Sequence, residues 1–355
     1  MNVAFFAPLK PPGHPTPSGD RALARALISA LDAGGHAVTL ASDLRIYEPR
    51  GDIAAQDALF ADAQEEVTRL LAHADAQSWG AWFTYHNYYK APDLVGPTVA
   101  RALNIPYLQV ESTRARKRLD GQWARFAAAA EAASDAAHTI FYFTHRDAET
   151  LRRDAPHGQN LRHLPPFLDR IDLPEVSTLE GPMLSVGMMR EGDKLNSYTL
   201  IARTLEALPS SLEWELDIAG DGPAYGAVEA LMEPFGQRVR LHGALDPIAL
   251  AKLYSHASLL LWPGVNEAFG LTYLEAQAAG VPVVAQDRPG VRDVVYAPLA
   301  DVDAGPSGLA AEVLNLTGKL NVLRDIGGKA RAIVAECHLA TSATRALNKT
   351  LESLT

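Results

Sequence analysis

The chain has 355 residues, a length that predicts two domains of ordinary size. Its composition, 48% hydrophobic and 21% charged, excludes a disordered or fibrous protein. The formal net charge of −10 argues against a nucleic-acid polymer as the main partner, because proteins that bind one present a basic face. A small phosphorylated ligand needs only two or three local cations and stays compatible with this charge.

The sequence predicts a cytoplasmic protein without a membrane span. Cys337 is the only cysteine, so no disulfide can form within the chain, as is usual in a reducing compartment. The first residues, MNVAFFAPLKPP, lack the charged region and long apolar core of a signal peptide. No run reaches the ~18 consecutive apolar residues of a membrane helix. Peripheral contact with the inner face of a membrane stays open, since residues 114–118 (RARKR) are basic.

In the N-terminal half, short apolar runs alternate with helical periodicity. The first run, residues 3–7, is followed by residues 21–31, whose apolar side chains recur on one helical face. Strands separated by helices predict βαβ units and a parallel sheet covered on both faces. The predicted strands of this half are 3–7, 36–41, 81–85, 106–111 and 139–144.

The proline-rich segment 164–174 (LPPFLDRIDLP) predicts a connection between domains, after which the alternation restarts. The predicted strands of the second half are 182–187, 215–219, 239–241, 258–262 and 281–285. We therefore expect an α/β protein of two Rossmann-like domains, residues 1–168 and 175–325, with parallel sheets that face each other across a cleft. Residues 326–355 predict a helical segment that packs back on the first domain.

The stretch 261–280 (LWPGVNEAFGLTYLEAQAAG) concentrates the candidate binding residues. A strand ends at Trp262, a tight loop carries Glu267, and a helix starts near Leu271 and carries Glu275. Gly270 at the helix entrance permits close approach to the backbone, and free N–H groups at a helix start favour an anionic pyrophosphate. Carboxylates accept hydrogen bonds from paired hydroxyls, so Glu267 suits a sugar ring and Glu275 a ribose diol.

This stretch and its continuation to VPVVA resemble the signature of the family-four (GT4-type) retaining glycosyltransferases of GT-B fold. The shared features are two glutamates separated by seven residues, Phe269-Gly270 and a helix that ends in small residues. The resemblance implies that a nucleoside-diphosphate sugar is the donor and that its binding involves Phe269, Gly270, Leu271, Thr272 and Glu275.

Three further segments match the family in the same order, so the resemblance covers about residues 182–295. The segment VGMMREGDK contains Arg190 and Lys194, and the resemblance implies that these cations hold the donor diphosphate. LDIAGDGP and VRLHGAL follow, which places Gly187 and His242 among the expected donor-binding residues. The implied catalytic residues are Arg190, Lys194 and Glu267. No Asp-x-Asp pair stands at an equivalent place, so we expect no metal and no other cofactor.

The N-terminal half resembles the family more loosely and is expected to bind the acceptor. The loop at 9–21 contains His14, an acceptor-side candidate, and Gly13. The loop stands where the family has a glycine-rich loop, which implies that Gly13 is a donor-binding residue whose backbone approaches the reacting sugar. Many members have a histidine at the strand end where this chain has Glu111. His86 and Arg114 complete the candidate acceptor residues.

Several alternatives stay open. Glu275 also suits an ordinary acidic position in a helix, and Arg190 and Lys194 suit surface pairs with Glu191 and Asp193. His86 also suits a structural histidine, and Arg114 a solvated face. The leading hypothesis is transfer of a sugar to an unidentified sugar, glycolipid or small-molecule acceptor, as in polysaccharide biosynthesis. A nucleotide-sugar epimerase and a non-catalytic sugar-nucleotide-binding module are the alternatives; a dinucleotide-dependent oxidoreductase is disfavoured, because no Gly-x-Gly-x-x-Gly follows the first strand.

Overall fold

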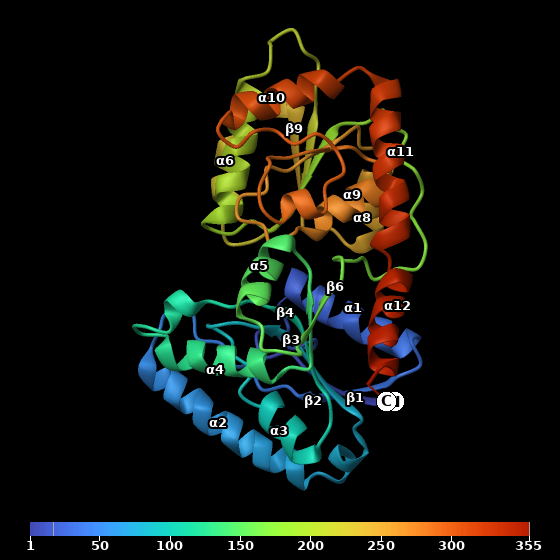
Figure 1. Ribbon diagram of the computed structural model, residues 1–355. Helices are drawn as coiled ribbons and strands as arrows, with labels where there is room; N and C mark the ends of the chain where they lie inside the picture. Colours follow the sequence, from blue (N-terminus) through green and yellow to red (C-terminus); the bar gives the residue numbers. More distant parts are fainter. Residues whose placement is uncertain (17, 355) are drawn as a thin grey trace. The chain divides into compact units, whose positions relative to one another are not determined.

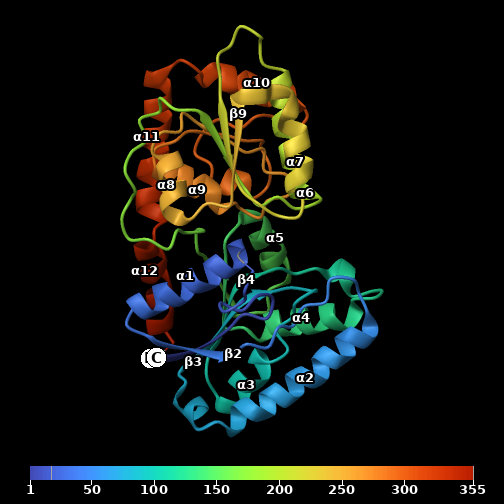
Figure 2. The ribbon, with the colours of Figure 1, turned by 180° about the vertical axis from the view of Figure 1, so that it is seen from behind.

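The structure is a computed structural model that describes residues 1–16 and 18–354 and divides into two compact units. Unit 1 consists of Met1–Pro165 and Ala340–Thr355, and unit 2 of Pro166–Leu339. Each unit is built on one parallel sheet with helices on both faces (Figures 1 and 2). The two parallel sheets confirm the α/β class predicted from the alternating runs.

The sheet of unit 1 has the strand order β2-β1-β3-β4-β5-β6 over the described residues. Its strands are β1 Asn2–Phe6, β2 Ala37–Ser42, β3 Ala81–Asn87, β4 Tyr107–Ser112, β5 Thr139–Tyr142 and β6 Asn160–His163. Its helices are α1 Gly19–Ala33, α2 Ile53–Ala72, α3 Gly96–Leu103, α4 Ala124–Ala136, α5 His145–Asp154 and α12 Ala340–Glu352, with short 3-10 turns η1 Ala74–Ser78 and η2 Arg116–Arg118.

Helices α1 and α12 pack together on one face of this sheet, and α2, α3 and α4 cover the other (Figures 1 and 2). The central strands are apolar because both of their faces are buried; Phe5, Trp82 and Phe83 are fully inaccessible to solvent. Polar side chains start the helices: Ser18 accepts a hydrogen bond from the Arg21 N–H at the start of α1. Such caps satisfy donors that have no partner within the helix.

Strand β6 was not predicted, because its sequence Asn-Leu-Arg-His shows no apolar run. The strand lies at the edge of the sheet and pairs only with β5, so most of its side chains face solvent. An edge strand of this kind has no hydrophobic pattern to reveal it.

The sheet of unit 2 has the order β11-β10-β7-β8-β9 over the described residues. Its strands are β7 Met183–Val186, β8 Leu216–Ala219, β9 Val239–Gly243, β10 Leu260–Leu261 and β11 Val283–Val284. Its helices are α6 Asp193–Glu206, α7 Tyr225–Met232, α8 Pro247–Tyr254, α9 Leu271–Ala278, α10 Gly305–Leu316 and α11 Leu320–Cys337, with 3-10 turns η3 Glu233–Arg238 and η4 Val291–Asp293. Helices α6 and α7 lie on one face and α8, α9 and α11 on the other (Figures 1 and 2).

The unit boundaries differ from the expected divisions at residues 168, 175 and 325. The connecting segment from Pro166 belongs to unit 2. The Pro166 carbonyl accepts a hydrogen bond from His338 Nδ1, and the Leu168 N–H donates one to the His338 carbonyl. The predicted terminal segment 326–355 is divided at Leu339, because α11 packs on α9 whereas α12 packs on α1. The chain therefore passes from one unit to the other twice.

Each sheet has a switch point, where two neighbouring strands lead into helices on opposite faces of the sheet. In unit 2, β7 leads into α6 on one face and the neighbouring β10 leads into α9 on the other. In unit 1, β1 leads into α1 and the neighbouring β3 leads into α3 on the opposite face. Open α/β sheets bind ligands beyond the carboxyl ends of the strands at such switch points.

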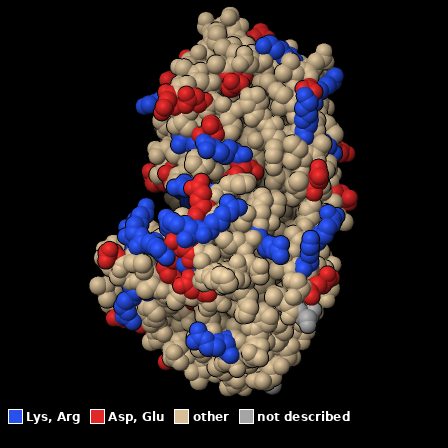
Figure 3. Space-filling view, in the orientation of Figure 1, with Lys and Arg blue, Asp and Glu red and all other residues tan. Residues whose placement is uncertain are grey.

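Acidic and basic side chains are interspersed over the face of the molecule shown in Figure 3. An anionic ligand on this face would be held by individual cations and not by a continuous basic surface. In the part of the chain that the structure describes, no helix combines the length and the apolar character needed to cross a bilayer.

Candidate functional site

The donor-side candidates converge at the switch point of unit 2. Arg190 and Lys194 follow β7, and Glu267 and Gly270 follow β10, the strand beside it. Because the carboxyl ends of parallel strands meet at one edge of a sheet, these residues from two distant segments become neighbours.

Lys194 and Glu267 are in direct contact. The Lys194 ammonium group forms an ion pair with Glu267 Oε1, and that oxygen also accepts a hydrogen bond from Trp262 Nε1 at 2.9 Å. Lys194 Nζ lies 5.2 Å from the centre of the Trp262 ring. Asn266 in the same loop donates a hydrogen bond to Asp193, which begins α6. The pairing of Lys194 is thus with Glu267, 73 residues away, and not with its sequence neighbours.

Arg190 is exposed, and its guanidinium makes no hydrogen bond or ion pair with any residue that the structure describes. Its backbone carbonyl accepts a bond from the Leu195 N–H, which fixes the turn from β7 into α6. A free guanidinium four residues before a paired ammonium, both after the end of β7, suits an anion such as a diphosphate, for which Arg supplies a planar fork of donors.

Gly187 is required by packing. A Cβ atom on Gly187 would lie 2.5 Å from the Trp262 ring, and its carbonyl accepts a hydrogen bond from Tyr198 at 2.7 Å. The glycine lets Trp262 approach the backbone, and the indole then reaches Glu267. The structure thus relates Gly187 to the site through Trp262.

The loop before α9 has an unusual backbone. Gly264, Asn266 and Gly270 have φ angles of 80°, 50° and 75°, in the left-handed region that glycine and asparagine tolerate. Gly270 caps α9 without a side-chain hydrogen bond, and Leu271 and Thr272 start the helix as expected. Phe269 is buried, 8% exposed. The aromatic ring therefore anchors the loop whose end exposes the first N–H groups of α9.

Glu275 and Thr272 share a tyrosine. Tyr254 at the end of α8 donates a hydrogen bond to Glu275 Oε2 at 3.0 Å and lies 3.0 Å from Thr272 Oγ1. Burial raises the pKa of the Glu275 carboxyl, and the Tyr254 hydroxyl and the charge of Arg170 offset part of this rise. The carboxylate is thus held in one orientation beside the helix start, a geometry that suits binding of a diol.

His242 lies on β9 and is exposed. Its Nε2 is 2.8 Å from Asp217 Oδ1, and the same oxygen accepts a hydrogen bond from Arg240 at 2.8 Å. Asp217 lies on the neighbouring strand β8. The Asp217 carboxylate therefore orients the His242 ring. His242 lies on the edge strand β9, which is separated from the β7–β10 pair by β8.

In unit 1, His86 and Glu111 lie together although they end different strands. His86 Nδ1 is 3.6 Å from Glu111 Oε2 and 3.6 Å from Asp20 Oδ1. Both His86 and Glu111 have positive φ angles, 69° and 58°. Burial raises the pKa of Glu111 to about 7; His86 opposes this rise, and Asp20 and Asp147 add to it. His86 thus places an imidazole beside the Glu111 carboxyl at the adjoining ends of β3 and β4.

The other acceptor-side candidates make internal contacts. Arg114 is buried and pairs with Glu131 at 2.8 Å and Asp135 at 2.6 Å, both on α4. It therefore anchors its loop to α4. His14 Nδ1 accepts a hydrogen bond from the Thr16 N–H at 3.1 Å, which shapes the loop at 9–21. Gly13, the donor-binding candidate of this loop, is exposed, and a Cβ atom there would lie 4.0 Å from Asp43 Oδ1. Pro17 of this loop lies outside the described residues.

Sequence reasoning missed Tyr254, Trp262 as a contact of Glu267, and Asp20 and Asp147. Tyr254 and Glu275 lie on different helices, 21 residues apart. Asp20 and Asp147 occupy first turns of α1 and α5, positions where acidic residues are common for helix stability alone. No spacing rule distinguishes them from ordinary first-turn acids.

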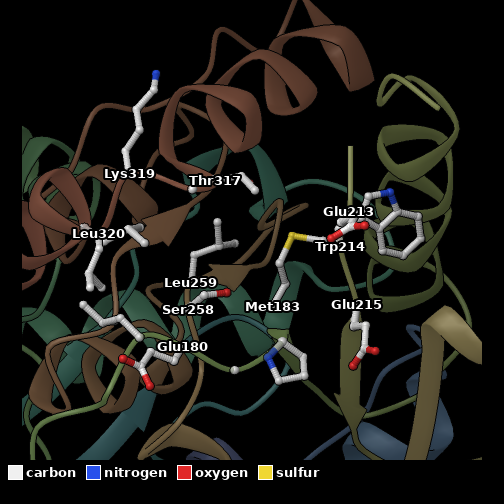
Figure 4. A pocket seen from close by; sticks show the side chains of 15 residues that line it. Glu180, Met183, Glu213, Trp214, Glu215, Ser258, Leu259, Thr317, Lys319 and Leu320 are labelled. Carbon is white, nitrogen blue, oxygen red and sulfur yellow. The ribbon is translucent and has the colours of Figure 1, made fainter. Parts of the chain in front are cut away.

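Figure 4 shows a pocket of about 300 Å³ in unit 2. Met183, Glu215 and Ser258 among its lining residues stand at the starts of β7, β8 and β10. The pocket thus lies at the amino ends of the strands, the opposite edge from Arg190 and Glu267, and contains none of the predicted site residues. Within residues 1–16 and 18–354, no group of His, Cys, Asp and Glu is arranged to hold a metal ion.

Comparisons with known proteins show similarity to glycosyltransferases, mainly in the second half of the chain. Residues 183–319 match the family model of glycosyl transferases group 1. The chain is 36% identical over 117 residues to a GDP-mannose-dependent alpha-mannosyltransferase from Mycolicibacterium smegmatis, which covers 32% of this chain and 30% of that protein. It is 24% identical over 345 residues to a D-inositol 3-phosphate glycosyltransferase from an Arthrobacter species, 83% of this chain and 80% of that protein. The chain spans only 14% of an exopolysaccharide phosphotransferase from Streptomyces coelicolor.

Solved structures share the fold over the full length. Sucrose-phosphate synthase from Thermosynechococcus elongatus matches with a TM-score of 0.76 at 18% identity, over 100% of this chain and 99% of that chain. HepE from Anabaena, in complex with UDP and glucose, matches with a TM-score of 0.72 at 15% identity over 100% of both chains. These identities show the fold alone. The resemblance found in the sequence is confirmed: the chain has the GT-B fold, and its residues 183–319 are a domain of the glycosyl transferases group 1 family.

Proposed function

We propose that this chain is a retaining glycosyltransferase that moves a sugar from a nucleoside-diphosphate sugar to an acceptor hydroxyl. The observation that carries the proposal is the convergence of Arg190, Lys194 and Glu267 at the carboxyl ends of β7 and β10. A cation pair suits the donor diphosphate, and a carboxylate beside it suits the transferred sugar. The relatives named as glycosyltransferases, and the UDP in HepE, support a nucleotide-sugar donor.

The reaction breaks the bond between the anomeric carbon and the diphosphate oxygen and forms a bond to the acceptor oxygen on the same face of the sugar. The proton of the acceptor hydroxyl passes to the departing diphosphate oxygen. Negative charge builds on the departing diphosphate. Arg190, Lys194 and the first N–H groups of α9 stabilise that charge by fixed positive potential. Glu267, released from Lys194 as the diphosphate takes its place, accepts hydrogen bonds from the sugar, and Glu275 receives the ribose. No metal ion is needed in this scheme.

His86 favours transfer over a non-catalytic binding module. The binding-module alternative was motivated by Glu111 at the position of the family's histidine. An imidazole 3.6 Å from that carboxylate supplies the same chemical group from the neighbouring strand.

The test is a screen of the full chain against UDP-, GDP- and ADP-sugars, with release of nucleoside diphosphate as the readout. We expect one donor to give release in the presence of EDTA. Lys194→Ala and Glu275→Ala should lower it by about 100-fold or more, because each removes a group that acts on the charged transition state or orients the donor. Exposed Lys252→Ala and Glu229→Ala in the same unit are the matched controls and should retain it.

Each outcome separates the hypotheses. Donor binding without release favours the binding module, and interconversion of the donor sugar without release favours an epimerase. An inverted anomeric centre in the product, detected by ¹H NMR, contradicts retention. No response to any donor contradicts the donor site itself.

A further inference from the structure

Four polar side chains form a cluster at the switch point of unit 1, which we call the unit 1 carboxylate cluster: Asp20, His86, Glu111 and Asp147. Asp20 and Asp147 lie in the first turns of α1 and α5, and His86 and Glu111 are the next-to-last residues of β3 and β4. In an open α/β sheet this is the edge where a ligand binds.

Two atoms of the cluster face each other without a hydrogen bond. His86 Nδ1 and Glu111 Oε2 are buried and have no hydrogen-bond partner among the described residues, and the 3.6 Å between them is too long for one. Glu111 is 8% exposed. A buried acceptor without a partner is costly, so an entering hydroxyl or ammonium group gains by donating to it.

The backbone holds this arrangement under strain. Both residues have positive φ angles, although neither is glycine. Such conformations persist only where the surrounding structure enforces them, and they concentrate at binding and catalytic sites. The positive φ angles are thus consistent with a binding role for His86 and Glu111.

The cluster repels anions. It contains three carboxylates and one imidazole, so it stays negative even when His86 is protonated. The nearby helix starts offer no compensation: Ser18 caps α1, Thr144 caps α5, and Asp20 and Asp147 occupy their first turns. Those starts would otherwise attract a phosphate.

The surrounding cations do not reverse this balance. Arg114 forms ion pairs with Glu131 and Asp135, and Arg21 donates hydrogen bonds to the backbone carbonyls of His14 and Pro15. Arg146 lowers the pKa of Asp147, but less strongly than burial raises it. Among these three arginines, only Arg146 acts on the cluster, which holds three carboxylates.

We infer that the unit 1 carboxylate cluster binds the acceptor through its hydroxyl or amino groups and excludes acceptors that carry a phosphate at this position. The acceptor class is a polyol or amino sugar without negative charge. This inference rests on the proposed transferase function and adds to it the chemistry that selects the acceptor.

The experiment uses the full chain and the donor found in the screen. Acceptors are offered in pairs that differ by one phosphate, myo-inositol against D-inositol 3-phosphate and glucose against glucose 6-phosphate, together with glucosamine. Nucleoside diphosphate release above hydrolysis gives kcat/KM for each. We expect at least a 10-fold preference for the uncharged member of a pair.

Glu111→Gln removes the ionisable carboxyl and keeps the shape. At pH 8, above the pKa of about 7, Glu111 is mostly ionised in the wild type, so the variant should reduce that preference at least threefold. Glu65→Gln removes a charge from an exposed site on α2 and should leave the preference unchanged. Asp20→Asn, at a side chain that is 39% exposed, is the second variant should Glu111→Gln fail to fold.

Different results would overturn the acceptor inference and the proposed transferase function. Release that depends on Lys194 but favours the phosphorylated acceptors, or a panel in which no uncharged acceptor raises release, overturns the inference alone. A preference that neither Glu111→Gln nor Asp20→Asn alters overturns it as well. Absence of any release that depends on Lys194 overturns the proposed function, and the inference with it.

Discussion

At the scale of single residues, burial raises the pKa of a key carboxyl group in each candidate site. Glu111 and Glu275 both have a raised pKa, and in both cases desolvation is the largest cause. The neighbours then differ: Glu111 faces the imidazole of His86, whereas Glu275 receives a hydrogen bond from Tyr254. Perturbed carboxylates of this kind concentrate at functional sites.

The raised pKa of Glu111 predicts a pH dependence of stability. The folded state keeps the proton up to a pKa of about 7, whereas the unfolded carboxyl releases it near 4.5. The folded state therefore binds more protons in this window, and stability falls as pH rises from 4.5 to 7. Relative to Glu111→Gln, the wild type should lose roughly 1–3 kcal/mol between pH 5 and 7.5. Urea unfolding at both pH values measures this, and a difference independent of pH would contradict it.

Tyr254→Phe is predicted to destabilise unit 2. The change removes one hydroxyl that serves Glu275 and Thr272, and the partly buried carboxyl loses its hydrogen-bond donor. We expect the free energy of unfolding to fall by about 1–2 kcal/mol. Tyr225→Phe is the control, because the Tyr225 hydroxyl has no hydrogen bond within the described part of the chain. Equal stability of the two variants in urea unfolding would argue against the Tyr254 contacts.

At the scale of elements, the candidate donor site depends on how strands β7 and β10 turn into helices. Trp262 at the end of β10 packs on the backbone of Gly187 at the end of β7 and then holds Glu267. The close approach of the two strand ends is possible because residue 187 has no side chain. A packing contact between elements thus orients a side chain of the site.

Gly187→Ala is therefore predicted to disturb both stability and the site. The new methyl group would lie 2.5 Å from the Trp262 ring, and the indole must move. Such overpacking costs about 1–3 kcal/mol. Gly226→Ala on α7 meets nothing within 4 Å and should stabilise the protein by up to about 1 kcal/mol, since alanine favours a helix. Urea unfolding of both variants checks the pair; destabilisation by Gly226→Ala to the same extent would refute the packing explanation.

At the scale of the whole molecule, the chain crosses between its units at residues 165/166 and 339/340, and both of its described ends belong to unit 1. Helix α12 packs on α1, and Asn348 bonds to the Gly34 carbonyl at 3.0 Å. Residues more than 300 positions apart thus stabilise the same unit. Long-range contacts of this kind couple the last helix to the first.

Leu347→Ala tests this coupling. Leu347 on α12 is fully buried, so truncation should cost unit 1 about 2–5 kcal/mol. Leu314→Ala on α10 is the control, because Leu314 is 37% exposed and its loss should be much smaller. Hydrogen exchange of unit 1 amides measures the effect. Unchanged protection in α1 of Leu347→Ala would show that α12 does not support it.

The sequence predicted the strands of both sheets except β6, because buried parallel strands leave apolar runs that are easy to read. It also predicted the order of the four motifs of residues 182–295, since each is continuous in the chain. It predicted residues 326–355 as one helical segment that packs on the first domain, because the helical pattern is the same throughout. In the structure α12 packs on α1 of unit 1, whereas α11 packs on α9 of unit 2.

For the candidate sites, the sequence determined which residue types stand at the strand ends: Arg190, Lys194 and Glu267 in one half and His86 and Glu111 in the other. Which of these side chains contact one another was decided by the tertiary structure. Whether Lys194 pairs with Glu191 or Glu267, and whether His86 reaches Glu111, depends on strand order, and strand order is fixed by packing among distant segments. Local propensity acts over a few residues, whereas these contacts join positions that only the folded sheets bring within a few ångströms of each other.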